Sequence, residues 1–244
     1  MPFRSVPPLV ALLLLACAPP MAWADEVTPS GGRARDAAPV DADYAGTGER
    51  MTFEDAARDL TAVYPIQISD AQQVVQNSFN WNGPADASLR CDIGFTPDAV
   101  VIRGEFVDDH PFCQTSLQPA MPDWWMITYG ADAIQFVFDD PTSATRRVGF
   151  VLNFGSRATR PQVDLLASPG RRPGRVAAAT LELFDGRPGA DEAQKAVHFR
   201  AAVPIAALGD PRFFGGALRI SVRMHDLDGD WSTYQVLQEV IEKK

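Results

Sequence analysis

The chain has 244 residues, of which 22 are basic and 31 are acidic, so its formal net charge at neutral pH is −9. An acidic surface repels phosphate groups, which argues against nucleic acid and anionic membranes as partners. The negative charge does not exclude uncharged ligands. The length suits a single hydrophobic core of ordinary size.

Residues 1–24 have the pattern of an export signal. Arg4 provides a short basic start, and the apolar run from Leu9 to Ala18 is too short for a stable membrane anchor. Ala22-Trp23-Ala24 offers small residues at the two positions that a signal peptidase recognises, so we expect cleavage before Asp25. The sequence therefore predicts an exported protein, periplasmic or secreted.

Export as a lipoprotein is the alternative to cleavage before Asp25. Leu14-Leu15-Ala16-Cys17 resembles a bacterial lipobox, in which Cys17 would be acylated and become the mature N-terminus. The protein would then be an outer-membrane lipoprotein. The lipid on Cys17 is the one membrane contact that we expect.

Residues 25–50 are rich in Gly, Ala, Pro, Asp and Arg and show no apolar period, which predicts a flexible tether. Thr52, followed three residues later by Asp55, favours a short capped helix between Met51 and Leu60. We therefore expect the folded domain to span residues 51–244.

From Tyr64 onward the chain alternates apolar and polar residues in short runs, the pattern of strands with one buried face. About nine or ten such runs are separated by turn signals such as Thr96-Pro97-Asp98, without a long helical period between them. The runs lie near residues 64–68, 89–95, 100–108, 133–138, 148–154, 163–166, 179–183, 197–203, 218–225 and 234–240. The expected fold is all-β: a two-sheet antiparallel β-sandwich, jelly-roll or immunoglobulin-like, with a short N-terminal helix.

The strand from Leu218 to His225 runs directly into an acidic turn at residues 226–230. Asp226, Asp228 and Asp230 crowd this turn, and like charges so close together are stable when solvated or when a cation lies between them. Calcium is the expected cofactor, although the turn is not an EF-hand because its twelfth position is Leu237. The alternative is a solvated turn whose carboxylates cap local backbone amides. Asp108-Asp109 is interpreted as a strand-end pair instead of a ligand set.

Cys17, Cys91 and Cys113 are the three cysteines of the chain. Once Cys17 is removed or lipidated, an even pair remains in an oxidising compartment, which favours a Cys91–Cys113 disulfide. Two buried free thiols are the alternative.

Several segments, in their order and spacing, resemble carbohydrate-binding module family 9-like (DOMON-like) domains over roughly residues 64–240. The resemblance implies a β-sandwich that binds a saccharide. The segments that carry it are Trp81–Ser88, a Trp and Asp-Ser opening turn; Phe95–Asp109, a hairpin ending in a double Asp; Tyr129–Phe136, an aromatic-x-x-Asp-x-Val-Glu-x-Phe strand; Phe199–Leu208, with an Ile-Pro-x-x-x-Leu element; and Gly216–Asp228, the closing strand with an Asn-Asp-x-Asp turn. The chain departs from this pattern at Gln135 (usually Glu), His225 (usually Asn) and Tyr129 (commonly Trp).

In the binding members of this family, sugars stack between aromatic side chains. We therefore expect a stacking platform made of Trp124, Trp125 and Tyr129, together with Trp231. Two adjacent Trp residues in an extended backbone cannot both point inward, so one should be exposed. Alternatively, one Trp plugs the sandwich end and the other lies against a loop. Gln135 and Arg103, expected on solvent-facing sides of their strands, are the polar candidates for hydrogen bonds to a saccharide.

We expect no enzyme, because the chain lacks Gly-x-Ser-x-Gly, His-Glu-x-x-His and Cys-His patterns and because His198 and His225 fall on the polar sides of their strands. Two other classes of function stay open. Related sandwiches bind haem as electron-transfer subunits, with Met126, Met224, His198 and His225 as candidate ligands here. The second class is an assembly domain that buries its Trp residues against a partner protein.

Overall fold

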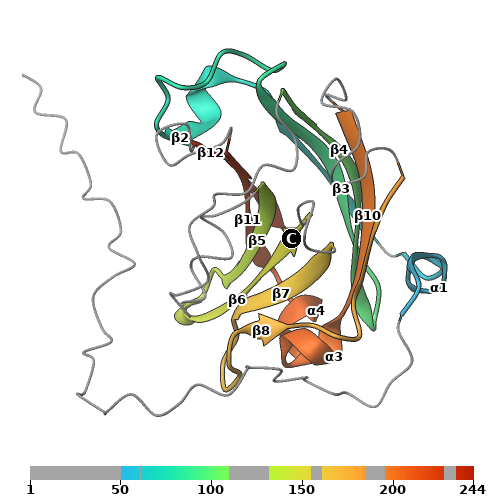
Figure 1. Ribbon diagram of the computed structural model, residues 1–244. Coiled ribbons are helices and arrows are strands. Elements are labelled where there is room, and N and C mark those ends of the chain that lie inside the picture. The colour runs from blue at the N-terminus through green and yellow to red at the C-terminus, as the bar shows by residue number, and fades with distance from the viewer. Residues whose placement is uncertain (1–50, 61, 110–131, 155–160, 185–195, 228–234) are drawn as a thin grey trace, which may run out of the picture. The chain divides into compact units, whose positions relative to one another are not determined.

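The structure, a computed structural model, describes residues 51–60, 62–109, 132–154, 161–184, 196–227 and 235–244. These residues form two antiparallel sheets, one of five strands and one of seven, packed face to face (Figure 1). The all-β sandwich predicted from the alternation of apolar and polar residues is therefore confirmed. The helices of the described part of the chain are short, and none is long and apolar enough to cross a membrane.

Sheet A has the strand order β1-β3-β4-β10-β9. Its central hairpin pairs Phe95 with Val100 across the predicted turn, where the Thr96 hydroxyl accepts hydrogen bonds from the backbone N–H groups of Asp98 and Ala99. The strands are β1 (Ala62–Ile68), β3 (Ala87–Phe95), β4 (Ala99–Asp108), β9 (Thr180–Leu183) and β10 (Ala196–Pro204).

Sheet B has the strand order β2-β12-β11-β5-β6-β7-β8. Strand β11, which contains the alternating run from Leu218 to His225, lies inside the sheet between β12 and β5. The strands are β2 (Val74–Gln76), β5 (Ala133–Asp140), β6 (Ser143–Asn153), β7 (Gln162–Ala167), β8 (Gly174–Arg175), β11 (Leu218–Asp226) and β12 (Gln235–Lys243).

Phenylalanine rings from both sheets fill the space between them. Phe106 of sheet A lies with its ring centroid 4.6 Å from that of Phe154, which follows β6, and Phe95 of sheet A meets Phe138 of sheet B edge-on at 6.1 Å. Rings in such tilted and edge-to-face arrangements contribute beyond their buried area. Met224 lies in the same core, as its place in the alternation predicted.

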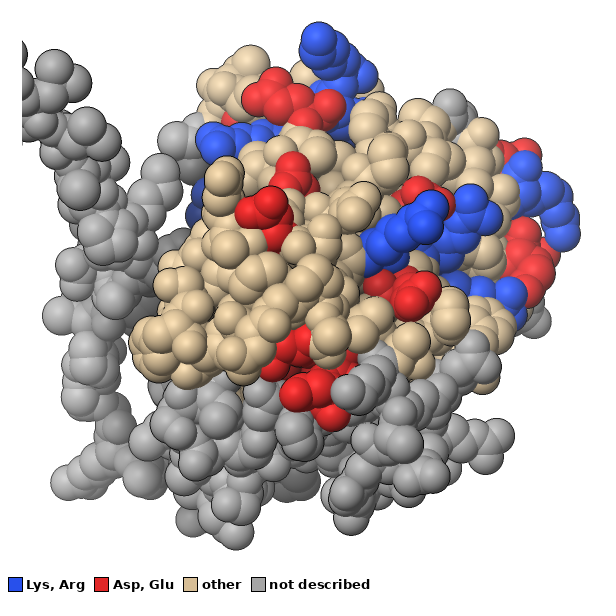
Figure 2. All heavy atoms as spheres, turned by 90° about the horizontal axis from the view of Figure 1, so that it is seen from above, with Lys and Arg blue, Asp and Glu red and all other residues tan. Residues whose placement is uncertain are grey.

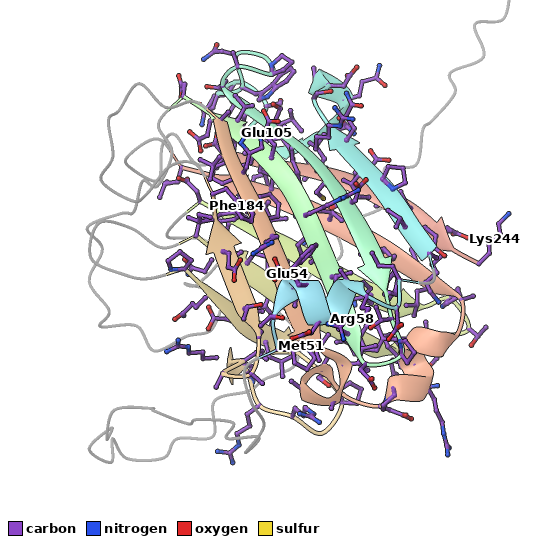
Figure 3. All side chains as sticks on the ribbon, turned by 90° about the vertical axis from the view of Figure 1, so that its right-hand side faces the viewer. Met51, Glu54, Arg58, Glu105, Phe184 and Lys244 are labelled. Atoms are coloured by element: carbon purple, nitrogen blue, oxygen red, sulfur yellow. The ribbon has the colours of Figure 1, made fainter. Side chains whose placement is uncertain are left out.

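The predicted N-terminal helix is α1 (Phe53–Ala57), and its N-cap is Thr52, whose side chain accepts a hydrogen bond from the backbone N–H of Asp55. Ala56 packs against Ala99, Val101 and Ala202 on the outer face of sheet A, which buries this small apolar patch (Figure 3). The helix is therefore held by tertiary contacts and by its cap, because five residues do not form a stable helix alone.

Three further helical turns are too short to be predicted from periodicity. The 3₁₀ helix η1 (Ala71–Gln73) precedes β2, whereas α3 (Ile205–Leu208) and α4 (Pro211–Gly215) lie between β10 and β11. The buried Phe214 of α4 packs against the ring of Phe138, so α3 and α4 close one end of the core. On the face shown in Figure 2, acidic and basic side chains are interspersed.

Candidate functional site

The outer face of sheet B carries a group of polar side chains on adjacent strands. Gln135 of β5 pairs in register with Arg223 of β11, and Arg223 in turn pairs with Gln238 of β12. One step along the strands, His225 pairs with Ala133, which pairs with Asn153 of β6. We call Gln135, Asn153, Arg223, His225 and Gln238 the sheet B polar row.

Two hydrogen bonds hold parts of this row in place. The His225 Nε2 and Gln135 Oε1 atoms are 3.1 Å apart, and Arg223 Nε donates to Gln238 Oε1 at 2.8 Å. Arg223, Gln238 and Asn153 are half-buried, so they form the accessible part of the row. Side chains fixed on neighbouring strands of a rigid sheet are suited to recognise a ligand by geometry.

The predicted exposure of Gln135 and His225 is wrong. Both side chains do lie on the outer face, as alternation requires, but Gln135 is 7% and His225 only 3% exposed. Burial, assisted by the positive charge of Arg223, lowers the pKa of His225 to about 3, so the imidazole is neutral at physiological pH. It therefore takes part as an uncharged hydrogen-bonding group.

Asp164 of β7 lies beyond Val151 on the same face and is also buried. Burial raises the pKa of its carboxyl group, while hydrogen bonds from Gln162 Nε2, at 2.9 and 3.0 Å from the two carboxylate oxygens, act in the opposite direction. Arg175 of β8 pairs with Asp164 in register and favours the ionised form. Hydrogen-bonding side chains therefore extend across the outer face of sheet B from the polar row to the edge strand β8.

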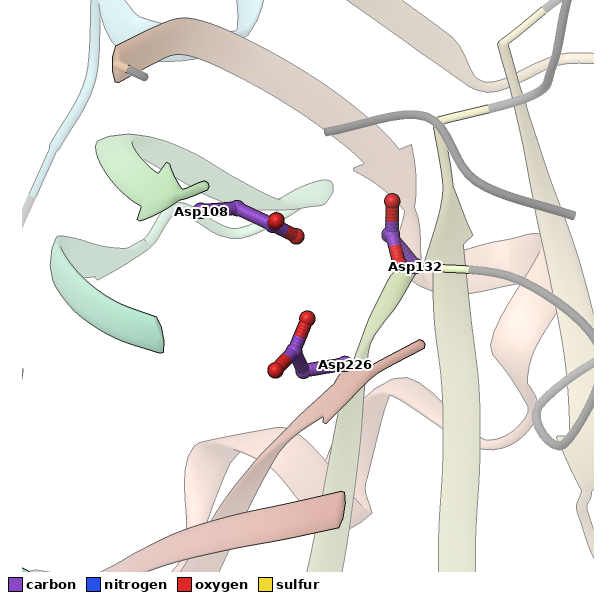
Figure 4. Close-up of side chains that lie close together, drawn as sticks. All are labelled: Asp108, Asp132 and Asp226. Carbon is purple, nitrogen blue, oxygen red and sulfur yellow. The ribbon is translucent and has the colours of Figure 1, made fainter. Parts of the chain in front are cut away.

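A cluster of three aspartates lies at the end of β11. Asp108 ends β4, Asp132 directly precedes β5 and Asp226 ends β11, and one carboxylate oxygen of each lies within 4.8 Å of the other two (Figure 4). All three are buried, and the backbone N–H of Leu227 donates to Asp132 Oδ1 at 3.1 Å. We call Asp108, Asp132 and Asp226 the aspartate cluster. These three carboxylates could hold a metal ion.

Gln235, the first residue of β12, contacts the aspartate cluster through its side-chain amide. Its Nε2 donates to Asp226 Oδ2 and, at 3.0 Å, to Asp86 Oδ2. Asp86 is itself held by the backbone N–H of Asn82 at 2.9 Å. Gln235 is fully buried, yet its Oε1 atom accepts no hydrogen bond from the residues that the structure describes. A buried acceptor that lacks a donor is costly and therefore unusual.

The aspartate cluster adjoins the sheet B polar row. Asp132 is three residues before Gln135 at the start of β5, and Asp226 directly follows His225 at the end of β11. Whatever fixes the aspartates therefore also fixes the ends of the two strands that carry the buried members of the row.

Arg103, the other polar candidate, lies on the opposite side of the molecule from Gln135. It is on the outer face of sheet A, where its Nε donates to Asp92 at 3.1 Å while its side chain stays 69% exposed. One ligand of modest size cannot contact both residues. The structure therefore assigns Arg103 and Gln135, which the sequence proposed for one saccharide site, to two different sheets.

Arg103 lines a shallow hollow of about 370 Å³ on sheet A, together with Glu105, His198 and Phe184. His198 and Glu105 approach within 3.4 Å, and Phe184, at the edge of the sheet, is 55% exposed (Figure 3). The Arg200 guanidinium covers the Phe184 ring at 4.6 Å from its centroid and donates to Glu182 at 2.6 Å. Paired charges thus surround this hollow, which makes it a less suitable site for a neutral ligand than the sheet B polar row.

Many residues predicted for function lie outside the described residues: the platform residues Trp124, Trp125, Tyr129 and Trp231, the turn residues Asp228 and Asp230, and Cys113. Cys91 is a buried free thiol in the structure, and burial raises its pKa to about 12. Its pairing with Cys113 stays a prediction.

The described haem-ligand candidates are not brought together. Met224 lies in the core, whereas the adjacent His225 points to the outer face of sheet B and His198 lies on the outer face of sheet A. Met126 lies outside the described residues.

Asp108, Asp132, Asp86 and Gln235 were missed as site residues. Asp108 was interpreted as part of a strand-end pair, but the structure includes it in the aspartate cluster. Asp86 and Asp132 both lie inside motifs that carry the family resemblance, and this position in the motifs could have marked them as candidate site residues. Nothing local distinguishes Gln235, because its role depends on a partner across the β11–β12 pair.

Comparison with solved structures finds a carbohydrate-binding module family 9 from Caldicellulosiruptor kristjanssonii, once in complex with cellotriose and once with glucose. In both cases the sequence identity is 8%, the match covers 62% of this chain and the TM-score is 0.34. The match covers 65% and 66% of those chains, slightly less than two thirds of their length. These proteins carry the name of the family that the sequence motifs resemble. No protein-family model matches the chain, and no curated protein matches it.

Proposed function

We propose that this protein is an exported, non-catalytic saccharide-binding module whose binding site is the outer face of sheet B. The observation that carries the proposal is the sheet B polar row. Its accessible groups are the guanidinium of Arg223 and the amides of Gln238 and Asn153, and the Arg223–Gln238 hydrogen bond and the buried His225–Gln135 hydrogen bond hold the row in place.

These groups suit a ligand that is rich in hydroxyls and uncharged. A hydroxyl both donates and accepts hydrogen bonds, so it can pair with amide and guanidinium groups alike. The chain's net charge of −9 does not hinder the approach of a neutral sugar as it would that of a phosphate. Hydrogen-bonding groups in a preformed site fix the orientation and supply the specificity.

Affinity would come from the aromatic residues that the family resemblance implies. Tyr129 precedes β5, the strand of Gln135, by only a few residues, and Trp124 and Trp125 come shortly before it. Apolar sugar faces stack on such rings, and an aromatic ring supplies a large contact area at low entropic cost. We include Trp124, Trp125, Tyr129 and Trp231 in the proposed site on sequence grounds.

We further propose that the aspartate cluster binds calcium. Its three ligand groups are carboxylates, and Ca²⁺ prefers oxygen ligands, whereas zinc and copper sites usually include imidazole or thiolate. Asp226 is the one aspartate of the predicted acidic turn that the structure describes. The proposed calcium would lie beside the polar row and would not itself be catalytic.

The test is a glycan array followed by calorimetric titration of the best ligand, with the full exported chain. Arg223→Ala should weaken binding about tenfold or more, since each lost hydrogen bond to a fixed group costs about 1–3 kcal/mol. Trp124→Ala and Trp125→Ala test the platform. Arg103→Ala is the matched control, an exposed arginine on the other sheet, and should bind normally.

The outcomes separate the alternatives. Binding that is lost in Arg103→Ala and kept in Arg223→Ala would move the site to the hollow on sheet A. Absence of any glycan signal, with co-purification of a protein partner, would favour an assembly domain. An absorbance band of haem in the purified protein would favour electron transfer.

A further inference from the structure

We propose that Phe79 forms an aromatic subsite that extends the saccharide site beyond the edge strand β2, so that the site takes a chain of two or more sugar residues. This inference rests on the saccharide binding proposed above and deepens it. It adds a binding residue from the described part of the chain and assigns a minimum length to the ligand.

Phe79 presents its side chain to solvent. Its exposed fraction is 80%, the highest among the large apolar side chains of the described residues, and nearby Val75 is 57% exposed. Phe79 lies in a turn, where small and polar residues usually predominate. Single exposed apolar side chains are ordinary on protein surfaces, so the rigidity and the position of this turn decide whether the ring serves binding.

The turn that carries Phe79 is fixed on both sides. The backbone N–H of Asn80 donates to the carbonyl oxygen of Asn77 at 2.9 Å, which closes a turn with Phe79 at one of its two central positions. Asn77 has a φ of 54°, a left-handed conformation that asparagine adopts more readily than most residues. Before the turn, β2 pairs with β12, and after it the Trp81 indole N–H donates to the carbonyl oxygen of Ala87 at 2.9 Å. Little conformational entropy is therefore lost when a ligand stacks on the ring.

The pairing of β2 with β12 connects this turn with the sheet B polar row. Gln76, the last residue of β2, pairs with Val236 of β12, which pairs with His225 of β11. Paired residues share a face, so Gln76 lies on the outer face of sheet B, where it is exposed. Gln238 follows Val236 by two residues on the same face, and such diagonal neighbours lie about 7–8 Å apart. Gln76 therefore continues the accessible part of the row to the edge of the sheet (Figure 1).

The spacing of these groups sets the length of the ligand. Neighbouring strands lie about 4.8 Å apart, so Arg223 of β11 and Gln76 of β2 are about 10 Å apart across β12. Phe79 follows Gln76 by three residues, which extends the site beyond the edge of the sheet by up to about 10 Å. A single sugar ring is too short to contact Arg223 and stack on Phe79 at once, whereas a chain of sugar residues can do both.

Phe79 and Gln76 would recognise different parts of a sugar. The apolar C–H face of the ring stacks on the phenyl group, and the amide of Gln76 both donates to and accepts from hydroxyls. Phenylalanine has no charge and no polar group, so this subsite selects for an apolar sugar face and against a charged substituent on that face.

The experiment is calorimetric titration of the full exported chain with neutral oligosaccharides of glucose, xylose and mannose, each from one to four residues long. Binding to the wild type should tighten from the monosaccharide to the longer chains. Phe79→Ala should leave the affinity for the monosaccharide unchanged and should weaken binding of the trisaccharide and tetrasaccharide about tenfold, because one stacking contact is lost. Phe79→Tyr keeps the ring and should bind like the wild type.

Phe184→Ala is the matched control, because it removes another exposed phenyl ring, 55% exposed, at the edge of sheet A. This variant should bind every chain length like the wild type. Since the Phe79 side chain is largely in solvent, Phe79→Ala should also unfold at the wild-type Tm, which separates the loss of a ligand contact from a loss of fold.

The subsite is overturned if the wild type binds oligosaccharides and Phe79→Ala binds them equally well, or if Phe79→Ala weakens all lengths alike; saccharide binding at the polar row would still stand. A loss of binding in Phe184→Ala that is absent from Phe79→Ala also overturns it. If the wild type binds no saccharide at all, the proposed function and the subsite both fail. A Tm of Phe79→Ala that falls as far as that of a core phenylalanine variant shows that the ring packs within the fold and contradicts the subsite.

Discussion

Gly104 lies in the middle of β4, directly opposite Cys91 of β3, and its lack of a side chain lets the two strands approach closely. A Cβ atom added at Gly104 would lie 2.5 Å from Cys91 Cβ, 2.6 Å from the carbonyl oxygen of Arg90 and 2.9 Å from Cys91 Cα. Two of these are backbone atoms of a paired strand, so they cannot move away without disrupting the sheet. Gly104→Ala should therefore be strongly destabilising.

Gly149 of β6 provides the matched comparison on the other sheet. A Cβ at Gly149 would lie 3.5 Å from the Phe136 carbonyl oxygen and 3.7 Å from Val137 Cγ2, which is ordinary contact. Overpacking costs about 1–3 kcal/mol or more, whereas Gly→Ala without strain stabilises by about 0.5–1 kcal/mol. The two variants should differ by about 2–4 kcal/mol, or roughly 5–15 °C in Tm for a domain of this size.

Urea unfolding of both variants, followed by tryptophan fluorescence and circular dichroism, measures the difference. Gly104→Ala should show a lower midpoint than the wild type, and Gly149→Ala an equal or higher one. If Gly104→Ala is as stable as Gly149→Ala, the β3–β4 pair does not approach as closely as the structure shows, and the argument from backbone contact is wrong.

Two further predictions concern buried titratable groups. Burial raises the pKa of Asp164 above 3.8, so the contribution of this group to stability is present below that pH and is lost as the pH rises through the folded-state pKa. The variant Asp164→Asn should therefore gain stability relative to the wild type from acid to neutral pH. A difference in urea midpoint between the two proteins that stays constant with pH would contradict this. In reduced, folded protein, Cys91 should react slowly with a thiol reagent, because it is 2% exposed and its pKa is about 12. Rapid reaction before unfolding would show that the thiol is accessible. In oxidised protein, an intact mass lower by two hydrogens identifies the predicted disulfide with Cys113.

The strands could be predicted because the local pattern and the tertiary environment agree. Phe150 and Leu152 of β6 point into the core while Val151 points outward, as their alternation indicates. The N-terminal helix was predictable because its cap, Thr52, acts over three residues. In contrast, β2, β8, α3 and α4 contain two to five residues each, fewer than a periodic pattern needs.

The site was less predictable than the fold. Alternation placed Gln135 and His225 on the correct face of sheet B, but it assigns only a side of the sheet and not the degree of burial, so their exposure was mispredicted. Arg103 and Gln135 seemed equivalent as polar strand residues. The order of strands in the two sheets separates them, and strand order depends on long-range pairing that local sequence does not encode.

The amino-acid sequence alone determined that this chain forms an antiparallel sandwich with a capped N-terminal helix, because side-chain alternation and capping are effects of neighbouring residues. Only the tertiary structure decided that Asp108, Asp132 and Asp226 meet within 4.8 Å and that the Gln235 amide lies against them. Asp108 and Asp132 are far in the chain from Asp226 and Gln235, which are nine residues apart on the consecutive strands β11 and β12. Their proximity results from the way two sheets pack and strands pair, which brings together charges that no local pattern could show to be neighbours.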